Sequence, residues 1–284
     1  AITVSGCDAL IRAAKTNNAK FFIGHNMRYM RVINEMKRII GSGMIGEVKT
    51  AWCRHFINYG GDAYFKDWHS EQRYSTGLLL QKGAHDIDVL HYLCGGYTTR
   101  VTAMGSLSVY DRCERRASGE LFDVHTGWKL TNWPPLEQKG FSPIIDVEDQ
   151  SMMLMHLDNG VQACYLQNHF TPDNCRNYTI IGTNGRIENV GDYPECSIRV
   201  WTQRVKGYGL SPTVHADFQI DMVETGSHGG ADVRIVDDFI KYLRTDSQPG
   251  VPWIAARNSV VTGIMATESL RNGSIPKDIP PPTN

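Results

Sequence analysis

The chain has 284 residues, of which 41% are hydrophobic and 21% are charged, and its 29 Lys and Arg residues nearly balance its 30 Asp and Glu residues. A net charge near zero argues against nucleic-acid binding, because a phosphate backbone requires clustered positive charge. No run of eighteen apolar residues is present, so no membrane-spanning helix is expected.

The seven cysteines are scattered and contain no Cys-x-x-Cys pair, which argues against a zinc ribbon or a thioredoxin-type site. The histidines are not at metal-ligand spacing either, so no metal is expected. A reduced, cytoplasmic protein is the simplest interpretation. Because the sequence lacks an initiator Met, we expect a fragment or a processed product.

The first quarter of the chain shows alternating helical and strand patterns. Residues 6–17 and 31–40 have a helical period, and the apolar run KFFIG at 20–24 has the length of a buried strand. Residues 48–58 have the pattern of a long strand. A helix followed by a short buried strand is the usual end of an α/β unit. Residues 6–24 are therefore expected to be the end of such a unit.

Residues 59–76 are rich in glycine, aromatic and charged residues. Loops that precede a packed helix often carry function. We expect Tyr64, Trp68, His69 and Arg73 to line a polar pocket there. The alternative is an aromatic loop that packs on the surface.

Residues 77–94, GLLLQKGAHDIDVLHYLC, predict a helix with two neighbouring stripes. One stripe is apolar and suits a core: it contains Leu80, Ala84, Ile87, Leu90 and Cys94. The other is polar: it contains Gln81, His85, Asp88 and Tyr92. An imidazole between an amide and a carboxylate suits proton transfer near neutral pH. A buried helix with a structural His85 is the alternative.

The second half predicts an antiparallel sheet. Strand-like runs cover 100–110, 150–157, 160–170, 178–182 and 186–189, and residues 111–148 are irregular. Asn-Gly turns at 159–160 and 184–185 predict hairpins. In the run 160–170, Tyr165, Gln167 and His169 alternate, so one sheet face could present them together.

Two helices and a tail follow. Residues 235–243 predict a helix with Val236, Phe239, Ile240 and Leu243 facing inward, and residues 257–270 predict the last helix. The Pro-rich tail is expected to fray. No G-x-G-x-x-G, Walker, G-x-S-x-G or H-E-x-x-H motif is present.

Five segments in this order resemble the glucose–fructose oxidoreductase, inositol dehydrogenase and rhizopine-catabolism family (Gfo/Idh/MocA). The segments are GHNMRYMRVINEMKRIIGSGMIGEV, GLLLQKGAHDIDVLHYLCGG, YTIIGTNGRIEN, HGGADVRIVDDFIKYLR and ATESLRNG. The resemblance implies an α+β fold: an open, mainly antiparallel sheet with helices on one face, preceded by the last helix and strand of a Rossmann-type domain. Residues 1–27 would be the remnant of that nucleotide-binding domain, and residues 28–284 would form the substrate-binding and oligomerisation domain.

The resemblance also implies a function. Relatives use NAD or NADP to oxidise a sugar, a polyol or a derivative, and their open sheet commonly forms a homodimer or homotetramer. The family's helix usually reads Asp-x-Gly-x-His: His85 and Gly83 match it, and Gln81 stands at the Asp place. We therefore expect His85 to be the base or the partner of the base, and Gln81 to hold the substrate.

Asp88 is expected to orient the His85 imidazole, and Lys82 to form a solvated ion pair with Asp86. The weaker candidates for substrate contact are Arg28, Tyr64, Trp68, Arg73 and His169. Two alternatives remain open at this point: an NAD-dependent glycosidase of the same superfamily, and a non-catalytic oligomerisation or ligand-binding fragment.

Overall fold

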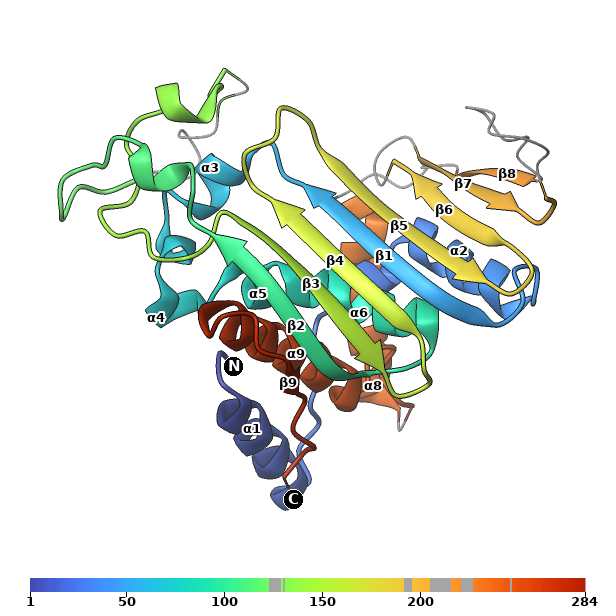
Figure 1. Cartoon of the computed structure of the whole chain (residues 1–284). Helices are drawn as coiled ribbons and strands as arrows, with labels where there is room; N and C mark the ends of the chain where they lie inside the picture. The colour runs from blue at the N-terminus through green and yellow to red at the C-terminus, as the bar shows by residue number, and fades with distance from the viewer. Residues whose placement is uncertain are drawn as a thin grey trace.

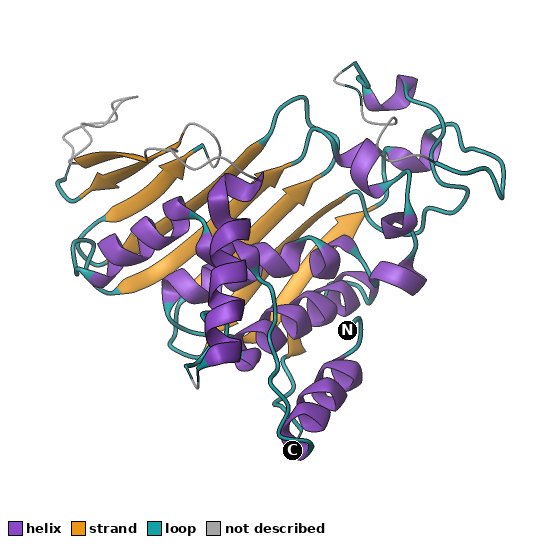
Figure 2. Ribbon diagram, turned by 180° about the vertical axis from the view of Figure 1, so that it is seen from behind, coloured by secondary structure: helices purple, strands orange, loops and turns teal. Residues whose placement is uncertain are grey.

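A nine-stranded sheet carries a layer of helices on one face, here called the inner face (Figures 1 and 2). The fold is described from a computed structural model, for residues 1–122, 129, 131–191, 196–204, 216–220, 227–245 and 247–283. Across the sheet the strands are β8 (Ala216–Ile220), β7 (Cys196–Trp201), β6 (Arg186–Val190), β5 (Cys175–Gly182), β1 (Val48–Phe56), β4 (Gln162–Asn168), β3 (Gln150–Leu157), β2 (Thr98–Ser106) and β9 (Lys277–Asp278).

The helices and single turns lie mostly on the inner face of this sheet and at one end of it. The longer helices are α1 (Val4–Thr16), α2 (Arg31–Gly41), α6 (Gly83–Cys94), α8 (Ala231–Arg244) and α9 (Trp253–Arg271). The short ones are α3 (Gly60–Tyr64), α4 (Gln72–Ser75), α5 (Leu78–Gln81), η1 (Asn26–Tyr29), η2 (Trp68–Ser70), η3 (Tyr110–Arg112), η4 (Pro135–Glu137) and η5 (Ser227–Gly230).

The predicted mainly antiparallel sheet with helices on one face is confirmed. Strands β1 and β4 run parallel, and the other pairings of the described strands are antiparallel. Strand residues alternate between faces, so Met153, Met155 and Val101 are buried against α6 and α9 while Met152 and Leu154 are exposed. The apolar stripe predicted on residues 77–94 is buried as expected.

Four local expectations were wrong. The run KFFIG forms no strand and has no strand partner within the described residues; its Phe21 N–H donates to the Tyr242 hydroxyl at 3.1 Å instead. The helix expected over 77–94 is broken at Lys82. The tail is anchored, because the Arg257 guanidinium donates to the Pro280 and Pro281 carbonyls and pairs with Asp8 on α1 at 2.6 Å.

The fourth error concerns α8. Its apolar stripe was expected to face inward, but Val236, Phe239, Ile240 and Leu243 are 36–53% exposed. The helix lies at the margin of the helical layer, where it contacts η1 and η5 rather than the sheet. The hydrophobic period shows which residues share one side of a helix, but it does not show which neighbour covers that side.

The fully buried Asp86 carboxylate joins α6 to three strands of the sheet. It accepts hydrogen bonds from Tyr165 on β4 at 3.0 Å and from Tyr178 on β5, and Arg176 Nε lies 3.2 Å from its Oδ1. His55 on β1 completes this Asp86 centre: its Nδ1 is 3.0 Å from Asp86 and its Nε2 is 2.9 Å from Arg176 Nη2. Because Arg176 can only donate, the His55 Nε2 accepts and Nδ1–H donates to the carboxylate.

The charges within the Asp86 centre follow from these contacts. Burial alone would raise the pKa of Asp86, but Arg176 and His55 outweigh it and hold that pKa far below its usual range. Burial and the neighbouring Arg176 lower the pKa of His55 to about 4. The centre therefore contains one carboxylate, one guanidinium and a neutral imidazole at pH 7.

A second buried imidazole fixes the other end of α6. His91 Nε2 accepts the Thr98 backbone N–H at 3.1 Å and thereby joins the helix to β2. Burial lowers the pKa of His91 to about 4. Both ends of α6 are therefore tied to the sheet through neutral histidines.

We predict that Asp86→Ala lowers the free energy of unfolding by about 3–5 kcal/mol, because it leaves Arg176 buried without its carboxylate. Urea unfolding followed by circular dichroism measures this. Glu35→Gln, which breaks the surface pair with Arg38, is the control and should change stability by no more than about 1 kcal/mol. Equal losses in the two variants would contradict the structural role of the Asp86 centre.

We also predict that stability falls as the pH drops from about 6.5 to 4. An unfolded histidine takes up a proton near pH 6.5, whereas folded His55 and His91 resist protonation until about pH 4. Between these values the unfolded state binds more protons, so each residue contributes a slope of about 1.4 kcal/mol per pH unit. His91→Gln keeps an acceptor for the Thr98 N–H and should remove the contribution of one histidine from that slope. His156→Gln, on the exposed side of β3, is the control and should leave the slope unchanged.

Candidate active site

The polar stripe of the central helix lies around the break between α5 and α6. Gln81 ends α5, Lys82 follows it, and Gly83 begins α6. A Cβ on Gly83 would lie 3.1 Å from the Tyr165 ring, so the glycine allows the helix to approach β4 closely. The break and this close approach set the direction of the next polar residue, His85.

His85 is half-buried, and its Nδ1 is buried without a hydrogen-bond partner. Burial, with smaller effects of His25 and Lys82, lowers the pKa of His85 to about 3, so the imidazole is neutral at pH 7. The Gln81 Oε1 is likewise buried and unpartnered. Buried polar atoms are normally hydrogen-bonded, so these two atoms on adjacent turns are candidates for ligand contact.

Asp88 does not contact His85, contrary to the expectation that it orients this imidazole. Its carboxylate accepts two hydrogen bonds from Arg28 at 2.7 and 2.8 Å, and His25 Nδ1 lies 3.5 Å away. The ring centroid of His25 is 5.7 Å from that of His85. His25 therefore separates the carboxylate from His85, and Arg28 is held by Asp88.

A second set of polar side chains surrounds Tyr64 at the end of α3. The Tyr64 ring packs edge-on against His69 and His169, with both centroid distances 5.2 Å, and the Lys82 ammonium lies 5.9 Å from its centroid. These four residues, here called the Tyr64 group, come from four separate segments. Lys82 contributes to lowering the pKa of His85, His69 and His169, so its charge reaches both parts of the site.

The expectation of a solvated ion pair between Lys82 and Asp86 was wrong, because the Asp86 carboxylate is fully buried. Asp86 is enclosed by its own partners in the Asp86 centre, and the Lys82 side chain extends toward Tyr64 instead. Lys82 itself lies between α5 and α6, with φ −101° and ψ −44°.

The other predicted contact residues divide into two kinds. His169 lies on the inner face, in line with Tyr165 and Gln167, as the alternation predicts. The Trp68 indole is 45% exposed and stacks on His69 at 3.9 Å, so it supports that ring. Arg73 is exposed and pairs with Glu71 at 2.7 Å, and the structure does not bring it to His85.

Sequence reasoning missed His25, Lys82 and the Asp86 centre as parts of this region. One signal was available for His55: it follows Ala51 and Cys53 at a period of two, so all three belong to the inward face of β1. His25 lies in a segment without a regular period, and nothing in its neighbours predicts its position beside His85.

The residues present do not fit the pyrophosphate of a dinucleotide, because the chain has no Gly-rich turn that opens a helix after a strand. Within the described ranges, no three His, Cys, Asp or Glu residues are arranged to hold a metal, and no helix is long and apolar enough to cross a membrane. The unpartnered atoms of Gln81, His69 and His169 fit a ligand that donates hydrogen bonds.

Comparison with known proteins gives relatives over most of the chain. The putative oxidoreductase YteT of Bacillus subtilis is 24% identical over 273 residues, which cover 84% of this chain and 64% of YteT. A levoglucosan dehydrogenase solved with NADH and levoglucosan has a TM-score of 0.74 at 16% identity and covers 99% of this chain and 72% of its own. An aldose–aldose oxidoreductase from Caulobacter crescentus, solved with glycerol, has a TM-score of 0.68 at 18% identity over 98% of this chain and 69% of its own.

The chain therefore spans about two thirds of YteT and about seven tenths of each of these solved chains. The solved structures share its fold. Residues 33–188, more than half of the chain, match the family model described as the GFO/IDH/MocA C-terminal domain. This chain belongs to the GFO/IDH/MocA family.

Proposed function

We propose that this chain supplies the substrate-binding and catalytic domain of an oxidoreductase that acts on a CH–OH group of a sugar, a polyol or a derivative. The observation that carries this proposal is the neutral His85 with an unpartnered Nδ1, near the start of α6, together with the unpartnered amide oxygen of Gln81 at the end of α5. Family membership and the oxidoreductase names of the relatives support it.

In this reaction the substrate hydroxyl loses a proton as its carbon loses a hydride. A nicotinamide cofactor, NAD or NADP, would accept the hydride when it is held by a nucleotide-binding part outside this chain. His85 would take the hydroxyl proton, since a neutral imidazole offers a lone pair at pH 7. Gln81 would accept a hydrogen bond from a neighbouring hydroxyl, because an amide cannot exchange a proton at that pH.

Residues 1–27 fit the proposed remnant of a nucleotide-binding domain. Helix α1 stands apart from the sheet in Figures 1 and 2, and the extended KFFIG run that follows has the length of a strand but no strand beside it in the described residues. The backbone groups of a strand are commonly paired in a sheet. We propose that the sheet of the nucleotide-binding domain provides those partners.

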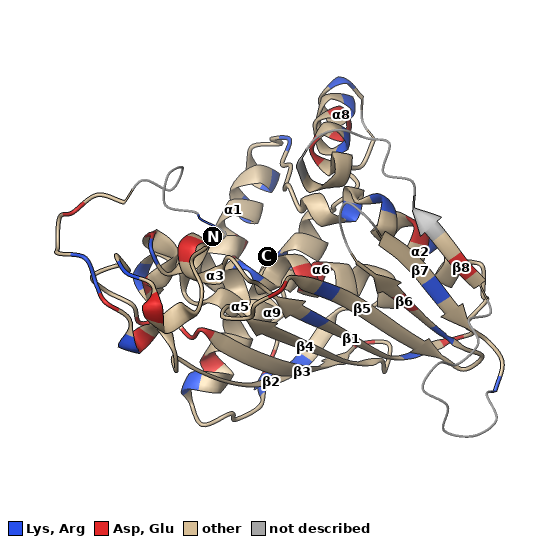
Figure 3. Ribbon diagram, turned by 90° about the horizontal axis from the view of Figure 1, so that it is seen from above, with Lys and Arg blue, Asp and Glu red and all other residues tan. Residues whose placement is uncertain are grey.

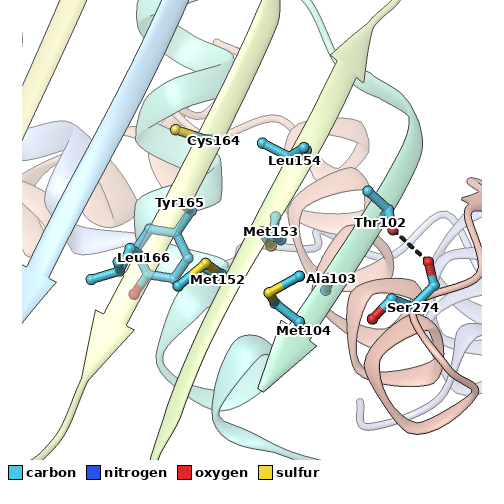
Figure 4. Close-up of a pocket in the computed structure, with 10 residues that line it drawn as sticks. All are labelled: Thr102, Ala103, Met104, Met152, Met153, Leu154, Cys164, Tyr165, Leu166 and Ser274. Carbon is cyan, nitrogen blue, oxygen red and sulfur yellow. Dashed lines mark hydrogen bonds between the residues drawn. The ribbon is translucent and has the colours of Figure 1, made fainter.

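We further propose a homo-oligomer, a dimer or a tetramer, formed through the outer face of the sheet. A pocket of about 250 Å³ lies there, and its lining residues come from β2, β3 and β4 and include Ser274, which follows α9 (Figure 4). Met104, Met152 and Leu154 are 46–62% exposed in it. Figure 3 shows Lys and Arg on several strands of the sheet, but none of the residues that line this pocket is charged. Apolar patches on an uncovered sheet face usually mark a partner site.

We predict that His85→Ala in the complete gene product lowers the turnover number about a hundred- to ten-thousand-fold, because positioned proton transfer is lost. Formation of NADH or NADPH from sugars and polyols, followed by absorbance, measures this. Gln81→Ala should mainly raise KM, and Gln81→Asp should retain turnover because Asp is the family's usual residue here. Near-normal turnover of His85→Ala with a much lower melting temperature would show that His85 is structural.

We predict that Leu154→Asp converts the oligomer to a monomer, because it places a charge at the centre of the proposed interface. Light scattering at tens of micromolar measures the molar mass. Leu136→Asp on η4 is the matched control, since Leu136 is 51% exposed and lies outside this face. A monomeric unmodified protein, or an oligomer that survives Leu154→Asp, would contradict the proposed interface.

A further inference from the structure

The proton that His85 would take up has to leave its ring before the next turnover. Burial, together with the neighbouring His25, Lys82 and Arg176, disfavours the protonated imidazole and lowers the pKa of His85 to about 3. A substrate in contact with the half-buried ring closes its exposed side to water, so the proton leaves toward the protein. A neighbouring side chain must therefore receive it.

The groups around His85 differ in their ability to accept a proton. Among the described residues, the charged and titratable side chains that act on His85 are His25, Lys82, Asp86 and Arg176. The Lys and Arg side chains can only donate at pH 7. Asp86 is enclosed by its partners in the Asp86 centre, which outweigh the effect of burial and hold its pKa far below its usual range. An imidazole exchanges protons near neutral pH, so His25 is the remaining acceptor.

His25 lies beside His85 and comes from a different part of the chain. The two ring centroids are 5.7 Å apart, and the ring planes are inclined by 45°. His25 directly precedes η1, whereas His85 belongs to α6, so the packing of η1 on α6 brings the rings together. The His25 side chain is 11% exposed, which gives a proton on it access to water.

The Asp88 carboxylate stabilises a proton on His25. His25 Nδ1 lies 3.5 Å from Asp88 Oδ1, which is longer than an ordinary hydrogen bond. Because a carboxylate only accepts, Nδ1 carries the proton of the neutral ring, and the contact becomes an ion pair when His25 gains a second proton. Burial would raise the pKa of Asp88, but His25 and Arg28 outweigh it and lower that pKa to about 2, so the carboxylate stays ionised.

We propose that His25 is a positioning residue, which receives the proton from His85 and holds it beside Asp88. The substrate O–H bond breaks as an N–H bond forms on His85 and the carbon loses its hydride to the nicotinamide. The N–H bond on His85 then breaks as one forms on His25, and His25 finally releases a proton to water, so both rings return to the neutral state. This inference rests on the proposed function and adds the path of the proton to it.

The test compares two replacements of His25 in the complete gene product, with glucose, myo-inositol and levoglucosan as substrates and absorbance of the reduced nicotinamide as the assay. His25→Gln keeps a hydrogen-bond donor for Asp88 but exchanges no proton, and His25→Phe keeps only a ring. We expect kcat to fall about a hundredfold in both variants, with KM within about threefold, because a positioned proton transfer is lost. His156→Phe on the exposed side of β3 is the control and should change neither.

The Gln variant separates a proton path from a structural contact. If the role of His25 is only to hold Asp88, His25→Gln should keep near-normal kcat while His25→Phe loses it. That result, or near-normal kcat in both variants, would overturn the inference and leave the proposed function intact.

A second measurement, ¹⁵N-histidine NMR of the unmodified protein during acidification, requires no turnover and also decides the question should a variant fail to fold. His25 must take up a proton before His85 does, because the Asp88 carboxylate contacts His25 and not His85. The reverse order would overturn the inference, even in an active enzyme. If no sugar or polyol is oxidised, the proposed function fails, and the order of protonation still decides whether His25 is the acceptor for a proton on His85.

Discussion

The pairing of Asp86 with the strands beneath it is the interaction on which the rest of the arrangement depends. Cys53 on β1 lies opposite Tyr165 on one neighbouring strand and Tyr178 on the other, so the register brings both phenol groups under the same helix. A slip of one residue in either pairing would turn a phenol to the outer face and leave the carboxylate without it. The Asp86 centre therefore links the strand register to the rotation of α6, and that rotation determines where His85 points.

The parts of the fold that could be predicted are those in which a local pattern is sufficient. Asn-Gly turns and alternating residues located β3 to β6, and the 3.6-residue period located α2, α6 and α9. The strand expected at 20–24 failed because a strand exists only with a partner, and the sequence of KFFIG contains no information about its partner. The inward face expected for α8 failed for a related reason: Val236 and Leu243 have the right spacing for burial, but the described part of the chain does not cover them. Strands β7 and β8 were not predicted, although Gly207, Gly209 and Pro212 lie between them in the sequence.

For the candidate site, helical spacing placed Gln81 and His85 on one stripe, and strand alternation placed His169 on the inner face. Spacing could not reveal which side chains meet across elements. Asp88 has the correct offset from His85, yet its carboxylate accepts two hydrogen bonds from the Arg28 guanidinium on η1 instead. Lys82 has the correct offset from Asp86, yet partners from the sheet already enclose that carboxylate and exclude solvent. In both cases partners distant in sequence outweighed the short-range pattern.

The parallel pairing of β1 with β4 has a consequence for how the chain folds. His55 and Tyr165, which meet through these strands, are separated by 110 positions in sequence, and the other neighbour of β1 follows later still. Each central pairing thus closes a very long loop, whereas the β3–β4 and β5–β6 hairpins close short ones. Contacts between distant positions form slowly because the entropy of loop closure is lost before they form. During synthesis β1 has neither neighbour until more than half of the chain has been made, so the centre of the sheet cannot form before β4 and β5 are available.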